Sequence, residues 1–203
     1  ELCNFRCNYC LPNGNPCDVP KNNLSLDEIS TLVSAFANLG TRKIRITGGE
    51  PALRKDLTDI ISICKNTPGI EKVALTTNGF NLKQTAKKFR QAGLDAINVS
   101  LDSLDPRMFN AITGKDKLND ILGGIDAALD EAIAKVKLNT VLMRQYNHQD
   151  IQACLNFIKH TPLSWRFIEL METGNNKRFF QENHVPGELI KQSLITQGWT
   201  RII

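Results

Sequence analysis

The sequence has little of what several classes of protein require. Its 203 residues include three histidines, and aromatic residues make up 6% of the chain. No apolar run approaches the roughly 18–20 residues that a membrane-spanning helix needs. The first residues lack the basic flank and apolar centre of a secretory signal peptide. We therefore expect no membrane partner, and we expect the protein to work in the cytoplasm.

The sequence also lacks a block of charge of one sign. Lys and Arg number 25 against 21 Asp and Glu, and the formal net charge of +4 is spread along the chain. A nucleic-acid-binding surface usually concentrates its basic residues on one face or one helix. The dispersed charge fits an anionic small molecule better, so no nucleic-acid partner is expected. The length suggests one domain, with a second only if it is small.

Hydrophobic periodicity predicts an alternation of strands and helices. Ser25 to Glu28 forms a capping-box pattern that opens a helix, and Gly40 provides its end. Strands that alternate with helices of ten or more residues predict βαβ units and a parallel sheet, closed either as an open doubly wound sheet or as a barrel. In both cases the loops after the carboxyl ends of the strands carry the chemistry. The expected strands cover residues 43–47, 73–77, 96–101, 136–143 and 165–170, and the expected helices cover 26–39, 56–65, 82–91, 119–133, 148–160 and 185–198.

Cysteines are concentrated at the start of the chain. Cys64 and Cys154 lie within helical apolar patterns and are interpreted as core residues. Cys3, Cys7 and Cys10 place three thiols within eight residues, and nothing indicates the oxidising compartment in which disulfides would form. Thiolates are soft ligands that favour iron–sulfur clusters, zinc and copper(I). The start of the chain is therefore a candidate metal site.

The spacing of these cysteines argues against a structural zinc ion. Such a site takes four ligands, commonly two CxxC pairs or a CxxC pair with two histidines. The histidines lie far along the chain, and the gap between Cys10 and Cys17 does not match a zinc-knuckle spacing. Three thiolates suit a four-iron cluster that leaves one iron open. Zinc binding in a non-catalytic module remains the alternative.

The Cx3Cx2C motif, with Tyr9 directly before its last cysteine, resembles the cluster loop of radical S-adenosylmethionine (SAM) enzymes. In that family the open iron binds SAM, and the reduced cluster releases a 5′-deoxyadenosyl radical. The resemblance implies that Cys3, Cys7 and Cys10 ligate a [4Fe–4S] cluster. It also implies SAM contacts from Tyr9, Ser100 and Met171. The implied fold is α/β, an incomplete TIM-type barrel of six βα units whose first strand is missing from this chain.

A Gly48-Gly49-Glu50 turn follows directly on the strand at residues 43–47. Glycines let a backbone approach a ligand closely, and Glu50 offers an acceptor for an ammonium group. No Gly-Lys-Ser/Thr follows, so the turn is not a P-loop. Such a turn is a weak signal when it occurs alone. Beside the cysteine motif it matches the family's glycine-rich turn, which implies that Gly48, Gly49 and Glu50 bind SAM.

Three cations lie within or at the start of predicted inner strands. Lys137, Arg166 and Arg45 occupy positions where a buried strand seldom holds a charge without a partner or ligand. Their coincidence favours a site for an anionic substrate such as a phosphate. In the alternative interpretation each side chain points into the helix layer or pairs with Glu169 or Asp102.

The stretches KIRITGGEPALRKDL, LTTNGF, AGLDAINVSLDSLDP, KLNTVLM and RFIELM are similar to one branch of the radical SAM family. That branch acts on GTP in the first step of molybdenum cofactor biosynthesis and forms a 3′,8-cyclised nucleotide. The resemblance implies GTP contacts from Arg45, Thr76, Lys137 and Arg166. It also implies an electron donor such as flavodoxin or ferredoxin, the cyclic pyranopterin monophosphate synthase as the next enzyme, and a homodimer as a candidate assembly.

The sequence departs from this branch at both ends. It has no cysteine after Cys154, so the branch's second [4Fe–4S] cluster is expected only in the full-length parent. Glu1 is not an initiator methionine, and we expect the chain to be a piece of a longer protein. Residues 1–171 are predicted to form the radical SAM core, and residues 172–203 to begin a C-terminal extension. A radical SAM enzyme acting on another substrate, such as a peptide or a cofactor precursor, is the enzymatic alternative.

Overall fold

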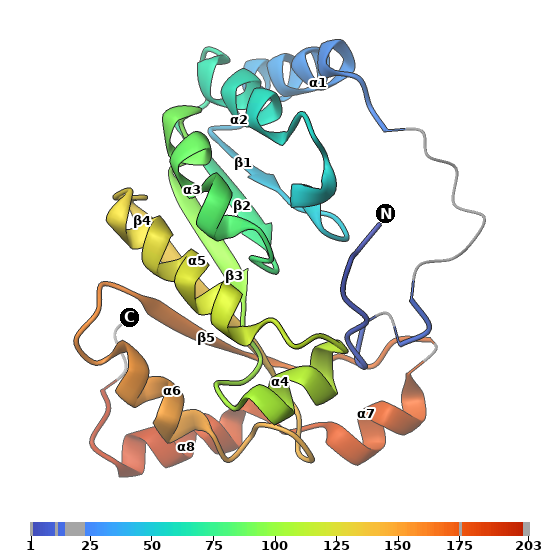
Figure 1. Ribbon diagram of the computed structural model, residues 1–203, viewed down its shortest axis with the longest axis vertical. Helices are drawn as coiled ribbons and strands as arrows, with labels where there is room; N and C mark the ends of the chain where they lie inside the picture. The colour runs from blue at the N-terminus through green and yellow to red at the C-terminus, as the bar shows by residue number, and fades with distance from the viewer. Residues whose placement is uncertain (1, 11, 15–22, 175, 201–203) are drawn as a thin grey trace.

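A five-stranded parallel sheet forms the centre of the protein in the computed structural model (Figure 1). The structure describes residues 2–10, 12–14, 23–174 and 176–200. The strands lie side by side in chain order, with no reversal of direction along the sheet. A doubly wound sheet reverses its strand order at a switch point, so the observed order is that of a partial barrel. The strands are β1 (Lys43–Ile46), β2 (Lys72–Thr77), β3 (Ala96–Ser100), β4 (Lys135–Leu142) and β5 (Ser164–Glu169).

Helices connect the strands as the sequence predicts, and two short helices were not predicted. The predicted ones are α1 (Leu26–Asn38), α2 (Leu57–Asn66), α3 (Leu82–Gln91), α5 (Leu118–Asp130), α6 (Ile151–Ile158) and α8 (Gly187–Thr196). The additional ones are α4 (Pro106–Thr113) and α7 (Lys177–Asn183), with a single 3₁₀ turn, η1 (Pro51–Leu53).

Helix α4 has clear signals at both of its ends. The Asp105 carboxylate accepts hydrogen bonds from the amides of Arg107 and Met108, and Pro106 occupies the first helical position. Gly114 ends the helix with a φ of 68°. These are the standard start and stop signals of a helix. They enclose 8 residues, and it is these end signals, which were not used in the prediction, that mark the helix in the sequence.

The two faces of the sheet have opposite character. On one face, fully buried apolar side chains such as Leu75, Val99 and Leu138 pack against the helices. The register places Thr76, Asn98 and Lys137 side by side on the other face, which we call the inner face. Figure 1 shows the N-terminal segment on this side of the sheet, away from α3 and α5. Because side chains alternate along a strand, the same residues build the core and direct polar groups inward.

The isolated cysteines are core residues, as predicted. Cys64 and Cys154 are buried, and no disulfide joins two of the described cysteines. Cys17 lies outside the described residues. Among the described helices, none combines the length and the apolar character needed to cross a bilayer.

Candidate active site

The segment of residues 3–10, which we call the cluster loop, is fastened to the barrel along its length. Phe5 is buried and its ring meets that of Phe109 edge to face, with the centroids 6.3 Å apart. The amides of Arg6 and Asn8 donate to the last carbonyls of α4, each at 3.0 Å. These carbonyls would otherwise lack partners within the helix. Helix α4, which the sequence did not predict, thus holds the loop in place.

The three cysteines of the cluster loop face one pocket of about 180 Å³, here called the cysteine pocket. Its other walls come from the loops after β1, β2 and β3, at the carboxyl end of the sheet. The pocket therefore lies at the carboxyl end of the strands, where the sequence predicted the functional loops. The predicted site residues that line it are Cys3, Cys7, Cys10, Tyr9, Gly48, Gly49, Glu50, Thr76 and Ser100.

The donor set of this pocket fits an iron–sulfur cluster better than a single metal ion. Burial, the charge of Asp102 and the neighbouring thiols raise the pKa of Cys7, so the metal-free thiol is neutral. Cys10 also has a raised pKa, chiefly because of burial. Among the described residues, no three Cys, His, Asp or Glu side chains lie close enough together to hold one ion. A cluster spreads its cysteine ligands over several irons and keeps the thiolates deprotonated.

The two glycines of the turn have different surroundings. A Cβ atom on Gly49 would lie 2.3 Å from the carbonyl oxygen of Leu2, whereas one on Gly48 would have no neighbour within 4 Å. The close approach at Gly49 is therefore to Leu2, the residue directly before the cluster loop. The amide of Glu50 donates to the same Leu2 carbonyl at 2.7 Å. Gly48 leaves the open space that a ligand would use.

Glu50 is 4% exposed, and its carboxylate is fully engaged with the protein. It accepts hydrogen bonds from the Ala52 amide at 2.9 Å, the Thr77 hydroxyl at 2.7 Å and the Asn78 amide at 2.6 Å. Burial raises the pKa of Glu50, and these bonds oppose that rise. The side chain predicted to accept an ammonium group thus also joins the β1 turn to the end of β2.

Asp102 is a site residue whose role the sequence did not indicate. The sequence suggests Asp102 only as an ion-pair partner for a cation. In the structure its Oδ2 instead accepts a hydrogen bond from the Tyr9 hydroxyl at 2.9 Å. Its Oδ1 accepts from the Val141 amide at 2.9 Å. Burial raises the pKa of Asp102 to about 6, and both hydrogen bonds oppose that rise. The interpretation of Asp102 as an ion-pair partner of Lys137 or Arg166 is therefore wrong.

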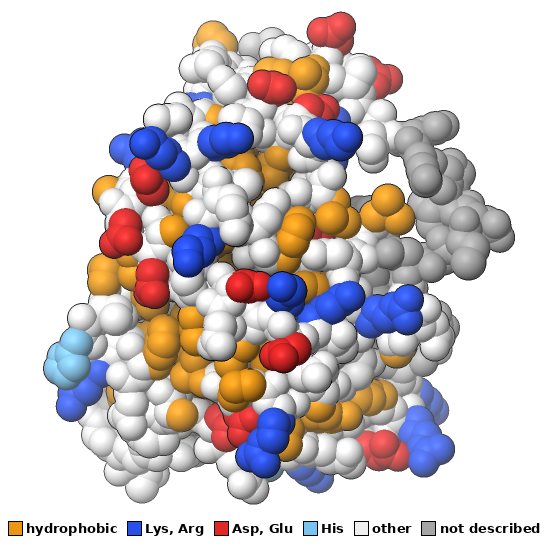
Figure 2. Space-filling model, in the orientation of Figure 1, with side chains coloured by type: hydrophobic (Ala, Val, Ile, Leu, Met, Phe, Trp, Pro, Cys, Tyr) orange, Lys and Arg blue, Asp and Glu red, His pale blue; other side chains and the backbone are white. Residues whose placement is uncertain are grey.

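The inner face carries a group of cations that have no acidic partners among the described residues. The pKa of Lys137 is lowered by desolvation and then by the positive charges of Arg166, Lys135, Lys43 and Arg45. In the part of the chain that the structure describes, none of these five residues forms an ion pair, and Glu169 pairs with His184 instead. The side of the molecule seen in Figure 2, by contrast, mixes basic and acidic side chains. The inner face is thus a candidate polyanion site.

This cationic group contains the predicted substrate residues and adds others to them. Arg45 donates to the Thr76 hydroxyl at 3.4 Å, which links the cations to the cysteine pocket. Lys43 and Lys135 were not predicted, although each lies two residues from a predicted cation and so shares its face. Asn139 was also missed, and its buried Oδ1 has no hydrogen-bond partner among the described residues.

Met171 is the predicted site residue that the structure leaves apart from the pocket. It follows β5, is 73% exposed and does not line the cysteine pocket. Among the described residues, Met171 does not contribute to the pocket in which the SAM contacts were predicted, and its contact with SAM stays a prediction.

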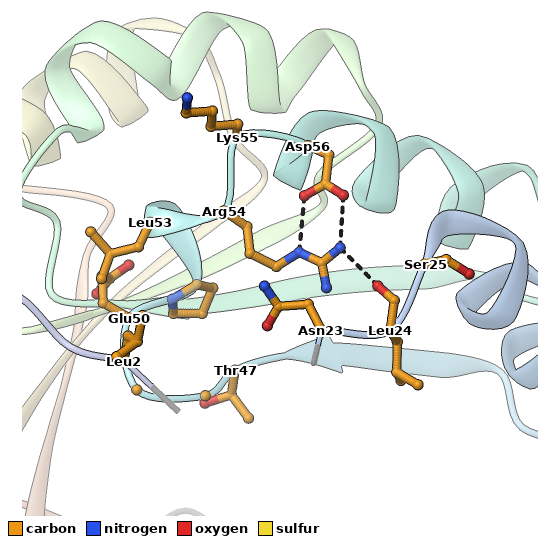
Figure 3. Close-up of a pocket in the computed structure, with 13 residues that line it drawn as sticks. Leu2, Asn23, Leu24, Ser25, Thr47, Glu50, Leu53, Arg54, Lys55 and Asp56 are labelled. Carbon is orange, nitrogen blue, oxygen red and sulfur yellow. Dashed lines mark hydrogen bonds and ion pairs between the residues drawn. The ribbon is translucent and has the colours of Figure 1, made fainter. Parts of the chain in front are cut away.

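A second cavity, of about 760 Å³, is also lined by the Gly48-Gly49 turn (Figure 3). One of its two basic side chains, Arg54, forms a two-pronged ion pair with Asp56 and donates to the Leu24 carbonyl at 3.0 Å. Figure 3 shows Lys55 extending away from this ion pair. Arg54 is therefore already neutralised, and the larger cavity is less suited to an anion than the inner face.

Comparison with known proteins agrees with this geometry. The family model described as the radical SAM superfamily matches residues 1–158. The chain belongs to the radical SAM superfamily. Its cofactors are accordingly a [4Fe–4S] cluster and SAM, and the cysteine pocket contains the thiols that such a cluster requires.

Curated relatives resemble the chain over nearly all of its length. It is 53% identical over 201 residues to a GTP 3′,8-cyclase of Pectobacterium atrosepticum, and 54% identical over 199 residues to one of Yersinia pestis. Each match covers 98% of this chain and 61% of the relative. The chain therefore spans less than two thirds of the length of these enzymes.

A solved structure supports the fold. SuiB of Streptococcus suis, solved with bound S-adenosylmethionine, superposes with a TM-score of 0.78 at 16% identity. The match covers 97% of this chain and 46% of SuiB. The α/β partial barrel predicted from the sequence is thus confirmed, while the low identity carries no information on substrate.

Proposed function

We propose that the full-length protein is a radical SAM enzyme that acts on GTP and forms a 3′,8-cyclised nucleotide in molybdenum cofactor biosynthesis. The observation that carries the proposal is the group of unpaired cations on the inner face, next to the cysteine pocket. The similarity to GTP 3′,8-cyclases supports it. When bound, the cluster and SAM supply a 5′-deoxyadenosyl radical.

The residues of the chain would bind and orient the two small molecules. Cys3, Cys7 and Cys10 are proposed to ligate the cluster. The proposed SAM contacts come from Tyr9, Gly48, Gly49, Glu50, Ser100 and Met171, and the proposed GTP contacts from Arg45, Thr76, Lys137 and Arg166.

Charge complementarity explains why a triphosphate suits the inner face. Cations that lie close together without counter-ions repel one another, and a bound polyanion removes that repulsion. Charge-assisted hydrogen bonds to phosphate oxygens are also stronger than neutral ones. The contact of Arg45 with the Thr76 hydroxyl, which lines the cysteine pocket, supports a phosphate site next to the pocket where the radical would form.

The division of the chain and its surroundings are part of the same proposal. Residues 1–171 would be the radical SAM core, and residues 172–203 would begin a C-terminal extension that carries a second cluster in the full-length protein. We infer a cytoplasmic enzyme that receives electrons from a flavodoxin or ferredoxin. Its product would pass to the cyclic pyranopterin monophosphate synthase, and a homodimer is the proposed assembly.

An isotope-transfer experiment tests the proposed reaction. The full-length protein, with reconstituted clusters, is given SAM, a reductant and GTP deuterated at the ribose 3′ position under anaerobic conditions. Deuterium in the released 5′-deoxyadenosine is the expected result. Unlabelled 5′-deoxyadenosine would assign the radical to another substrate. A protein that holds its cluster and yields no 5′-deoxyadenosine would contradict the enzymatic proposal.

A further inference from the structure

One hydrogen bond joins the middle of the cluster loop to the sheet across 93 residues of sequence. The Tyr9 hydroxyl, between Cys7 and Cys10, donates to Asp102 Oδ2 at 2.9 Å. Tyr9 is half-buried, and Asp102 is 4% exposed. The loop's other contacts hold its beginning and its backbone. This bond acts on the short segment between two of the three cysteines.

The acceptor is itself held by two further hydrogen bonds. Asp102 Oδ1 accepts from the Val141 amide at 2.9 Å, and its backbone carbonyl accepts from the Asn147 side chain at 2.8 Å. Asn147 also holds the Val141 carbonyl at 2.9 Å. These bonds fix the orientation of the carboxylate, and its second oxygen, Oδ2, is directed at the Tyr9 hydroxyl. A carboxylate held this firmly can fix the position of a more mobile partner.

We propose that Asp102 is a positioning residue for the iron–sulfur cluster, which holds the Cys7–Cys10 segment in its ligand geometry through the Tyr9 hydroxyl before the cluster is inserted. The proposal rests on the cluster ligation proposed above and is independent of the substrate. Hydrogen bonds to a charged group are among the stronger ones in proteins. Losing this one should loosen the segment that carries two ligands while leaving the apolar core intact.

The test compares Tyr9→Phe with Tyr146→Phe in the full-length protein. The chain has two tyrosines, and no hydrogen bond involves the Tyr146 hydroxyl among the described residues, so Tyr146→Phe is a matched control. In cluster-free protein, Tyr9→Phe should raise amide hydrogen exchange in residues 3–10 and leave exchange in β4 unchanged. After reconstitution, loss of the cluster to a chelator should be about tenfold faster than in the wild type. Tyr146→Phe should match the wild type in both measurements.

A double-mutant cycle with Asp102→Asn separates positioning from general stability. The double variant should lose its cluster no faster than the more affected single variant, because both changes act on the same bond. Wild-type exchange and cluster loss in Tyr9→Phe would overturn the proposal. Additive effects of the two changes on the rate of cluster loss would also overturn it. The same holds if Tyr9→Phe lowers the melting temperature enough to account for its faster cluster loss.

A further variant distinguishes this proposal from the one on which it rests. In the full-length protein, Cys7→Ala should lose the iron of the cluster proposed at Cys3, Cys7 and Cys10 and retain only that of the second cluster. If Cys7→Ala binds iron as the wild type does, the ligand assignment is wrong and the positioning proposal falls with it. If Cys7→Ala loses iron while Tyr9→Phe behaves as the wild type, the positioning proposal alone is wrong.

Discussion

At Gly49 the backbones of two segments pass so closely that a methyl group has no room. The nearest atom is a backbone carbonyl oxygen, which cannot move aside as the end of a flexible side chain could. The neighbouring Gly48 has open space. A sequence pattern of two adjacent glycines therefore conceals two different requirements, one for the fold and one for ligand access.

Gly49→Ala should destabilise the protein by about 1–3 kcal/mol, the usual cost of forcing an extra carbon into a packed position. Gly48→Ala should change the free energy of unfolding by less than about 1 kcal/mol, since its Cβ meets nothing. Denaturant unfolding of both cluster-free variants checks this. Equal stability of the two variants would mean that the contact with Leu2 does not constrain the turn.

Glu50 offers a second prediction at this scale. Glu50→Ala leaves the Thr77 hydroxyl and two backbone amides without their acceptor in a buried position, so a loss of about 3 kcal/mol or more is expected. Glu50→Gln keeps the shape and one acceptor oxygen and should cost about 1–2 kcal/mol. Denaturant unfolding compares them. If the two variants unfold alike, the carboxylate's bonds are not what holds the turn to β2.

The strands are the elements that separate core from chemistry. Apolar residues alternate with Thr76, Asn98, Lys137 and Arg166 along β2 to β5, so each strand supplies both faces. A shift of one residue in any strand would exchange the two sets. Burial of the apolar set thus fixes which cations face inward.

Replacing one inner cation should improve stability while it weakens binding. Lys137→Gln relieves repulsion from its neighbours and should raise the free energy of unfolding by about 0.5 kcal/mol, an effect that added salt diminishes. The same change should weaken GTP binding about tenfold, with SAM cleavage retained. Calorimetric titration and thermal unfolding measure the two effects. Lys87→Gln on the exposed face of α3 is the control, and a Lys137 variant with unchanged GTP affinity would count against the triphosphate site.

The elements were more predictable from the sequence than the contacts between them. Periodicity located each described strand to within a residue or two, because apolar alternation is a local property. It missed the short helices α4 and α7, and α4 is marked in the sequence by its end signals at Asp105, Pro106 and Gly114. The pocket residues Cys3, Gly48 and Ser100 were recognisable from motifs, whereas the Tyr9–Asp102 bond joins residues 93 apart and has no local signal. Lys43 and Lys135 could have been found by extending the two-residue period.

The molecule as a whole should keep its fold when the metal is removed. The cluster loop is held by Phe5, which is part of the hydrophobic core, and by backbone hydrogen bonds to α4, so neither anchor requires the metal. Small zinc domains behave differently, because metal binding supplies most of their folding free energy. Chelator-treated protein should retain its far-ultraviolet circular dichroism and unfold cooperatively. Loss of the helical signal together with the iron would contradict this expectation.

The order of the strands leaves β1 at one margin of the described sheet, with a single strand beside it. An exposed margin can recruit the margin of another molecule and so begin aggregation. Strand β1 is only 4 residues long, and Lys43 and Arg45 alternate with its two isoleucines. Short length and positive charge both discourage such pairing. The cations proposed to attract a nucleotide would therefore also discourage unwanted strand pairing at this margin of the described sheet.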